Sequence, residues 1–179
     1  MLDKQNTGLI IVDIQGKLAN TVYQHQTLIT NYTKLIKGAL VLNIPLICLE
    51  QNPLKLGPTV EPLQALLKNV PTISKFTFNG CAEEKFVTEV KQANVETWLI
   101  CGIESHICVY QTALGLVEIG YQVQLVHDCI SSRTQNNNQL GINKLTAHGV
   151  ELSGLEMCLY ELVKDCRAPE FKRILNLIK

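Results

Sequence analysis

The sequence predicts an α/β fold: a three-layer sandwich in which a mainly parallel, six-stranded sheet lies between two layers of helices. Apolar runs of strand length alternate along the chain with segments in which apolar residues recur at the spacing of one helix face. The apolar runs are continuous rather than alternating with polar residues, which indicates strands buried on both faces. Such strands, separated by helices, are typical of a parallel sheet covered on both sides.

The six strands and five main helices follow one another in the sequence. The strands are expected at GLIIVDI (8–14), PLICLE (45–50), PTISK (71–75), ETWLICG (96–102), QVQLVHD (122–128) and GVELSG (149–154). The helices are expected between and after them, at residues 27–42, 82–93, 106–119, 136–147 and 154–165. In the first helix, Leu28, Tyr32 and Leu35 fall on one apolar stripe. No linker or repeat interrupts this pattern, and so residues 1–179 are predicted to form one domain.

Composition narrows the class of partner. Hydrophobic residues make up 46% of the 179 residues, charged residues make up 18%, and the formal net charge is zero. These values argue against a disordered chain and against binding to nucleic acid or to a membrane surface. The expected partner is therefore a small molecule or another copy of the chain.

The N-terminal stretch and the cysteines indicate a reducing compartment. The stretch MLDKQNTG lacks the pattern of a signal peptide, and no segment is long and apolar enough to span a bilayer. The chain has seven cysteines, an odd number, and none forms a CxxC pair. This usage is typical of proteins with reduced thiols. We therefore expect a cytoplasmic protein.

Reactive side chains stand where the predicted strands end. Asp13 lies at the end of the first strand, Lys75 ends the third, and the fourth runs through Gly102 into the turn GIESHIC. Because the ligand site of an open parallel sheet lies beyond the carboxyl ends of its strands, these segments are expected to converge there. A buried Asp needs a partner, and Lys75 can supply the opposite charge. Taken alone, however, Asp13 and Lys75 fit an ordinary structural ion pair equally well.

Cys108 favours a catalytic interpretation. It lies in the first turn of a predicted helix, where free backbone N–H groups and the helix dipole favour the thiolate. A neighbouring ammonium group would lower the pKa of the thiol further, and a carboxylate could take its proton. Buried cysteines are usually inert. That interpretation is adopted for Cys48, Cys101, Cys129, Cys158 and Cys166, and Cys81, shortly after a turn, is also expected to be a bystander rather than the nucleophile.

The histidines do not indicate a metal site. The chain has four of them, far apart in sequence and without HxH or HxxxH spacing. His106 lies two residues before Cys108, and side chains at that spacing on a helix point apart. His106 is therefore expected to line the entrance of a site rather than to act as its base. Glycine-rich phosphate-binding motifs do not occur either.

Five stretches resemble the isochorismatase-like cysteine hydrolases, in order and across nearly the whole chain. They are LIIVDIQGKL (9–18), CLEQNPLKLGPT (48–59), SKFTF (74–78), LICGIESHICVYQTALGL (99–116) and VHDCISSR (126–133). The combination of VDIQ, an isolated lysine in SKF and GIESHICV is specific, whereas any one of them alone is weak. The EQNP stretch followed by LG looks closest to a group of uncharacterised hydrolases within that family.

The resemblance implies a parallel sheet flanked by helices and a catalytic triad at Asp13, Lys75 and Cys108. It also implies a cis peptide bond between Ile103 and Glu104, and an oxyanion hole made by the backbone N–H groups of Glu104 and Cys108. Family members such as nicotinamidases and N-carbamoylsarcosine amidases hydrolyse amide or carbamoyl C–N bonds through a thioester, whereas isochorismatase itself uses no cysteine nucleophile. The presence of Cys108 therefore favours the amidase branch.

The chain departs from the nicotinamidases at their metal site. Those enzymes bind a metal through an Asp-x-His element after the second strand and through further histidines. Here the corresponding residues are Glu50, Gln51 and Asn52, and no histidine lies between His25 and His106. No metal and no cofactor are therefore expected, and nicotinamide is not favoured as the substrate. The side chains expected to line the substrate pocket are those of Gln15, Gln51, Phe78 and His106.

Two other classes of function remain open. An accessible thiol of low pKa also suits a redox sensor in which Cys108 is oxidised. The fold can also serve a catalytically idle interaction protein. The small number of charges and the apolar helical tail FKRILNLIK (171–179) predict a homo-oligomer, at least a dimer.

Overall fold

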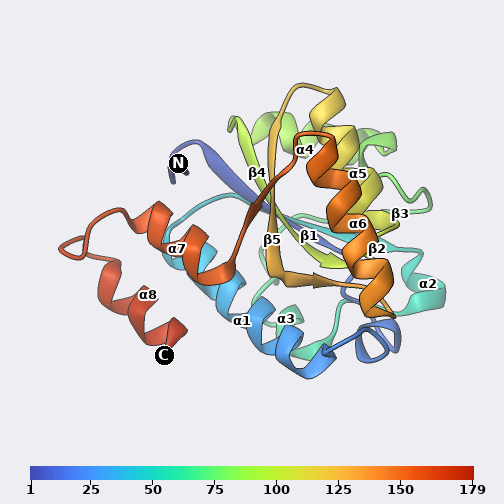
Figure 1. Cartoon of the computed structure of the whole chain (residues 1–179), viewed down its shortest axis with the longest axis horizontal. Coiled ribbons are helices and arrows are strands. Elements are labelled where there is room, and N and C mark those ends of the chain that lie inside the picture. Colours follow the sequence, from blue (N-terminus) through green and yellow to red (C-terminus); the bar gives the residue numbers. More distant parts are fainter.

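Six parallel strands form the central sheet of the protein, whose computed structural model describes residues 1–179 (Figure 1). Their spatial order is β3-β2-β1-β4-β5-β6, and each neighbouring pair is parallel. The strands are β1 (Thr7–Val12), β2 (Leu46–Gln51), β3 (Thr72–Lys75), β4 (Thr97–Ile103), β5 (Gln122–Ser131) and β6 (Glu151–Ser153). The predicted α/β fold is confirmed, and the sheet is parallel throughout.

Two helical layers cover the sheet, and each buries its own apolar core (Figure 1). The helices on one face are α1 (His25–Val41), α3 (Glu61–Gln64), α7 (Leu155–Val163) and α8 (Phe171–Ile178). The helices on the other face are α4 (Glu84–Gln92), α5 (Cys108–Glu118) and α6 (Gln135–Ala147). No helix is long and apolar enough to cross a membrane.

Two four-residue helices in the segment between β2 and β3 were not predicted. They are α2 (Pro53–Leu56) and the α3 helix given above, and each carries a proline at its start, Pro53 and Pro62. Proline fits the first turn of a helix because its missing N–H would have no helical partner there. Helices of one turn leave no apolar periodicity in the sequence, which is why the pattern did not reveal them. Single turns of 3₁₀-helix also occur at Leu18–Asn20 and Gly80–Ala82.

Strand β5 is longer than predicted because it contains a bulge. Leu125 pairs with Ile100, but the next pair along β4 joins Ile130 to Gly102, so the chain loops out between them. Within the looped part, the Asp128 carboxylate accepts a hydrogen bond of 2.7 Å from the backbone N–H of Leu155, at the start of α7. The bulge thus lets β5 contact α7 and still run on beside the end of β4.

Gly102 allows β1 and β4 to approach closely at the point where both strands end. Its φ is +143°, a conformation that L-residues rarely adopt, and a Cβ atom added to it would lie 2.2 Å from the carbonyl oxygen of Val12. Gly120, in the turn after α5, also has a positive φ of +97°, but a Cβ atom there would meet nothing within 4 Å. A side chain at position 102 would therefore suffer both backbone strain and a steric clash, whereas a side chain at position 120 would suffer backbone strain alone.

We predict that Gly102→Ala lowers the free energy of unfolding by about 3 kcal/mol or more, because backbone strain adds to a clash with the neighbouring strand. Gly120→Ala carries the strain alone and should cost about 1–2 kcal/mol. Urea denaturation of both variants measures the difference. Equal losses would show that the close approach at Gly102 is unimportant.

Four cysteines lie in the core between the sheet and the layer that contains α1: Cys48, Cys101, Cys129 and Cys158. Burial raises the pKa of the Cys48 and Cys158 thiols from the ordinary value of 9.0 to about 12. Burial also raises the pKa of Cys101 and Cys129 well above that value. The folded state therefore keeps these thiols protonated at a pH at which the unfolded chain releases the protons.

From these shifts we predict an alkaline loss of stability. Above about pH 9 the unfolded state binds fewer protons than the folded state, so the free energy of unfolding falls as pH rises towards 12. Each fully buried cysteine should contribute a loss on the order of 1 kcal/mol between pH 8 and pH 10. Denaturation under reducing conditions measures this loss of stability. Cys48→Ala should show a smaller loss, because it lacks the contribution of one buried thiol. An unchanged pH dependence in Cys48→Ala would contradict the assignment.

Candidate active site

The site lies at the carboxyl edge of the sheet, between the neighbouring strands β1 and β4. The chain continues from β1 to β2 on one side of this point and from β4 to β5 on the other. A ligand site in an open parallel sheet is expected at such a switch point. Asp13 follows β1 directly, Lys75 is the last residue of β3, and the loop after β4 leads into Cys108, the first residue of α5. The structure thus brings together the three residues that the sequence had placed at strand ends.

Lys75 and Asp13 form a buried ion pair. The distance from Lys75 Nζ to Asp13 Oδ2 is 2.7 Å, and the side chains are 0% and 3% exposed. Lys75 Nζ also donates to the side-chain oxygen of Gln51 at 2.7 Å and to the carbonyl of Thr77 at 3.4 Å. Because an ammonium group has three donors, each has a protein acceptor. The second oxygen of the carboxylate, Asp13 Oδ1, is buried without a hydrogen-bond partner.

The thiol of Cys108 adjoins this ion pair and is protonated at neutral pH. Burial raises its pKa to about 12, the negative charge of Asp13 adds to the rise, and Lys75 opposes it. This corrects the expectation of a low pKa for a thiol at the helix start, because burial is the largest influence on Cys108. Burial also raises the pKa of the Asp13 carboxyl, against the attraction of Lys75. A carboxylate of raised pKa next to a protonated thiol is suited to act as its proton acceptor.

The loop between β4 and α5 has a different backbone from the one predicted. The peptide bond between Ile103 and Glu104 is trans, so the expected cis bond is wrong. Instead, Glu104 adopts a left-handed conformation with φ of +50°, which turns the chain at the end of β4. Its carbonyl accepts hydrogen bonds from the N–H groups of Ile107 (2.9 Å) and Val109 (3.3 Å). The N–H groups of Glu104 and Cys108 donate no hydrogen bond in this loop, which leaves them free to act as the predicted oxyanion donors.

The side chain of Glu104 anchors the same loop to the end of β5. Its buried carboxylate lies 3.1 Å from Nε of Arg133 and 3.3 Å from Nδ1 of His106. His106 Nδ1 is also 2.8 Å from the hydroxyl of Ser132, which in turn bonds to the hydroxyl of Ser105. His106 is therefore tied to this network. The roles of Ser132 and Arg133 were not predicted, because nothing in their local sequence indicates a contact with the loop that follows β4.

The other predicted wall residues have different surroundings. The Gln15 side chain is fully buried, and its amide nitrogen donates to the carbonyls of Gln51 (3.1 Å) and Gly57 (2.7 Å). Gln51 contacts Lys75 as described above. Phe78 is 53% exposed in the segment after β3, and its carbonyl accepts a bond of 3.5 Å from the Thr112 hydroxyl on α5. Gln15 therefore braces the backbone under the site, whereas Phe78 lies at the surface.

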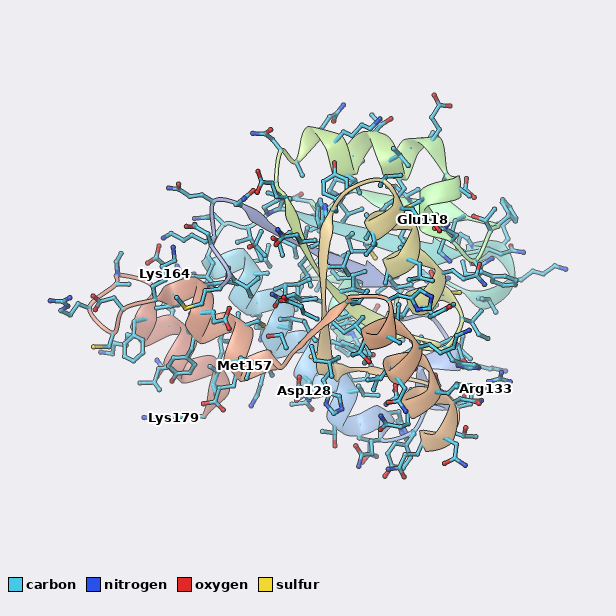
Figure 2. The ribbon with its side chains drawn as sticks, turned by 45° about the horizontal axis from the view of Figure 1, so that its top comes forward. Glu118, Asp128, Arg133, Met157, Lys164 and Lys179 are labelled. Carbon is cyan, nitrogen blue, oxygen red and sulfur yellow. The ribbon has the colours of Figure 1, made fainter.

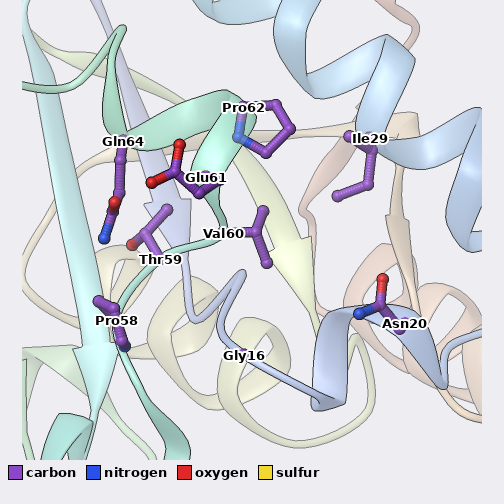
Figure 3. Close-up of a pocket in the computed structure, with 9 residues that line it drawn as sticks. All are labelled: Gly16, Asn20, Ile29, Pro58, Thr59, Val60, Glu61, Pro62 and Gln64. Carbon is purple, nitrogen blue, oxygen red and sulfur yellow. The ribbon is translucent and has the colours of Figure 1, made fainter.

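A separate hollow lies beside the loop that follows Asp13. Its volume is about 500 Å³, and its lining residues, shown in Figure 3, are Gly16, Asn20, Ile29, Pro58, Thr59, Val60, Glu61, Pro62 and Gln64. Asp13, Lys75 and Cys108 are not among them. This hollow and the candidate active site are therefore distinct places on the molecule.

The residues at the end of β2 do not fit the metal site of nicotinamidases. One oxygen of the Glu50 carboxylate accepts hydrogen bonds from the backbone N–H and the hydroxyl of Thr59, at 2.6 and 2.7 Å. The Gln51 amide is engaged by Lys75 and by the carbonyl of Phe76. Nowhere in the chain do three or more His, Cys, Asp or Glu side chains gather in a way that could hold a metal ion.

A family model, a sequence relative and a solved structure each match most of the chain. The isochorismatase domain model matches residues 7–157. Isochorismatase domain-containing protein 2 of Danio rerio is 33% identical over 177 residues, which cover 99% of this chain and 89% of that protein. A solved structure of MAR1 ribonuclease from Caenorhabditis elegans is 33% identical, with a TM-score of 0.93, covering 99% of this chain and 91% of that one.

Two further solved structures are similar over almost their whole length. YcaC from Pseudomonas aeruginosa, determined with hexane-2,5-diol and covalent acrylamide, is 26% identical with a TM-score of 0.93, covering 98% of this chain and 90% of that one. The YcaC gene product of Escherichia coli, described as an octameric hydrolase of unknown specificity, is 24% identical with a TM-score of 0.93, covering 98% and 89%.

Proposed function

Since the chain belongs to the isochorismatase family of hydrolases, we propose that it is a cysteine-dependent hydrolase that cleaves a C–N bond of a small amide or carbamoyl compound. The observation that carries the proposal is the buried Lys75–Asp13 pair, with its 2.7 Å contact, beside the thiol at the start of α5. Nucleophile, proton acceptor and a fixed positive charge thus lie together at the expected edge of the sheet.

In the proposed reaction, Asp13 takes the proton of the Cys108 thiol as the sulfur attacks the carbonyl carbon of the substrate. The resulting oxyanion accepts hydrogen bonds from the backbone N–H groups of Glu104 and Cys108, each of which contributes about 3 kcal/mol by comparison with similar donors. The C–N bond then breaks, and Asp13 gives the proton to the departing nitrogen. A water molecule, deprotonated by Asp13, attacks the thioester carbonyl. The C–S bond then breaks, the acid product leaves, and Asp13 returns the proton to the Cys108 sulfur. Lys75 stabilises the negative charge throughout, and no cofactor takes part.

The covalent acrylamide in the Pseudomonas aeruginosa relative indicates a nucleophilic group in that protein but no substrate class, because nucleophiles add to the C=C double bond of acrylamide and leave its amide intact. The name of the Caenorhabditis elegans relative points to RNA. For this chain, two features argue against RNA: its formal net charge is zero, and the donors of Lys75 are occupied by protein acceptors. A redox-sensing role is less favoured, because oxidation requires thiolate and the pKa of Cys108 is about 12. The seven free cysteines accord with a cytoplasmic location.

We predict that Cys108→Ala abolishes hydrolysis, lowering turnover by at least about 1000-fold, because no other group can form the thioester. The measurement is ammonia release from a panel of small amides and carbamoyl compounds. Cys81→Ala is the matched control, since Cys81 is half-buried near α5 but touches the Thr112 carbonyl rather than Asp13 or Lys75. Near wild-type turnover by folded Cys108→Ala would rule out the assigned nucleophile.

We also propose that the protein is a homo-oligomer. The octameric state of the Escherichia coli relative supports this. So do exposed apolar side chains on β6 and α7, where Leu152 is 44%, Met157 58% and Tyr160 37% exposed. Met157 is labelled in Figure 2, on the helix pair that projects from the sheet.

The expected mass in solution is therefore at least twice that of the 20.0 kDa chain. Light scattering at several concentrations measures it. If only a 20.0 kDa species occurs at every concentration, the proposed oligomer does not exist.

A further inference from the structure

We propose that Gln51 is a positioning residue that directs the Lys75 ammonium group onto Asp13 through its side-chain amide oxygen. The inference rests on the proposed cysteine-dependent hydrolysis and extends it to a residue outside the triad. Gln51 is the last residue of β2 and pairs in register with Lys75 on β3. To reach Asp13 beyond β1, the Lys75 side chain must pass the end of β2, where the Gln51 amide lies.

The hydrogen bonds of Lys75 make the Gln51 amide its principal neutral acceptor. The contact with Gln51 Oε1 is 2.7 Å, as short as that with Asp13 Oδ2, whereas the Thr77 carbonyl lies 3.4 Å away. Lys75 is fully buried, so solvent does not substitute for a lost acceptor. Without the amide oxygen, one donor of a buried ammonium group has no partner, and its geometry towards Asp13 is no longer fixed.

The orientation of the Gln51 amide is determined by its surroundings. Its nitrogen donates to the carbonyl of Phe76 at 2.8 Å. Because a carbonyl only accepts and an ammonium group only donates, a single orientation of the amide satisfies both partners. The backbone N–H of Gln51 donates to Gln15 Oε1 at 2.6 Å, and Gln15 lies two residues after Asp13. The contacts therefore close a ring from Asp13 through Gln15, Gln51 and Lys75 back to Asp13.

Because Gln51 is neutral, it adds no charge to the surroundings of the Cys108 thiol. With glutamine present, the charged neighbours of the thiol are one carboxylate, Asp13, and one ammonium group, Lys75. A carboxylate at position 51 would compete for the ammonium group and place a second negative charge near the sulfur, which disfavours the thiolate.

The carboxylates in the surrounding segments are bonded to groups other than the Gln51 side chain. Glu50 accepts hydrogen bonds from the N–H and the hydroxyl of Thr59. Glu83 accepts hydrogen bonds from the N–H of Phe76 and the hydroxyl of Thr77. Glu104 is paired with Arg133 and His106. A shift in the reactivity of Cys108 in Gln51→Met, which adds no charge, therefore reports on the Lys75–Asp13 pair, whereas Gln51→Glu adds the direct effect of a second carboxylate.

The test compares Gln51→Glu and Gln51→Met with a matched control, Gln64→Glu, which adds the same charge at an exposed position on α3. The rate of Cys108 alkylation by iodoacetamide is measured from pH 6 to pH 10 in the full chain, by mass spectrometry of the peptide that contains it. For Gln51→Glu we expect a profile displaced upward by about one pH unit and a rate about tenfold lower at a given pH. Gln51→Met should also be slower, and Gln64→Glu should match the wild type.

Circular dichroism and thermal melting establish whether each variant is folded. A folded Gln51→Glu protein whose pH profile superimposes on that of the wild type overturns the inference, even if it melts earlier, because a purely structural role lowers stability without moving the profile. If Gln51→Glu does not fold, Gln51→Met decides by its rate of alkylation: a rate equal to the wild type overturns the inference. A wild-type protein in which Cys108 does not react at any pH instead refutes the proposed nucleophile.

Discussion

The buried ion pair between Lys75 and Asp13 is the contact on which the carboxyl edge of the sheet depends, because two charges removed from water are costly unless every remaining donor finds an acceptor. Lys75 is satisfied by the Asp13 carboxylate and by two neutral oxygens, from Gln51 and Thr77. Those acceptors come from the ends of three adjacent strands or from the segments that follow them. The register of β1, β2 and β3 is therefore part of the site, since a shift by one residue would turn these side chains to the opposite face.

Burial, together with the negative charge of Asp13, explains why the Cys108 thiol is held protonated. With Asp13 and Lys75 both charged, the buried group is neutral only as long as Cys108 keeps its proton. Forming a free thiolate there would leave a net negative charge in a poorly solvated place, which is reflected in a pKa of about 12. Transfer of the proton to Asp13 during the attack avoids that charge. A cysteine controlled in this way differs from the exposed, low-pKa thiol of a redox sensor.

The loop after β4 owes its shape to contacts with β5 rather than to its own residues. The N–H of Ser105 donates to the carbonyl of Ser131 at 2.9 Å, and the Glu104 carboxylate meets Arg133 beyond it. These contacts help to hold Glu104 in its left-handed conformation, and the backbone N–H groups of Glu104 and Cys108 stay free. The bulge in β5 matters here, because it allows one strand both to contact α7 and to reach this loop.

The sequence by itself determined the fold class, the six strands and the three reactive residues at or next to their ends, because continuous apolar runs and helical periodicity are local signals. It did not determine the pKa of Cys108, the trans turn at Glu104, the network through Ser132 and Arg133, or the bridge that Gln51 makes to Lys75. The local sequence indicated that a helix starts at Cys108, but the burial that raises the pKa of its thiol comes from residues distant in the chain. Solvation and hydrogen-bond partners are set by which segments meet and in which register, and only the tertiary structure decides that.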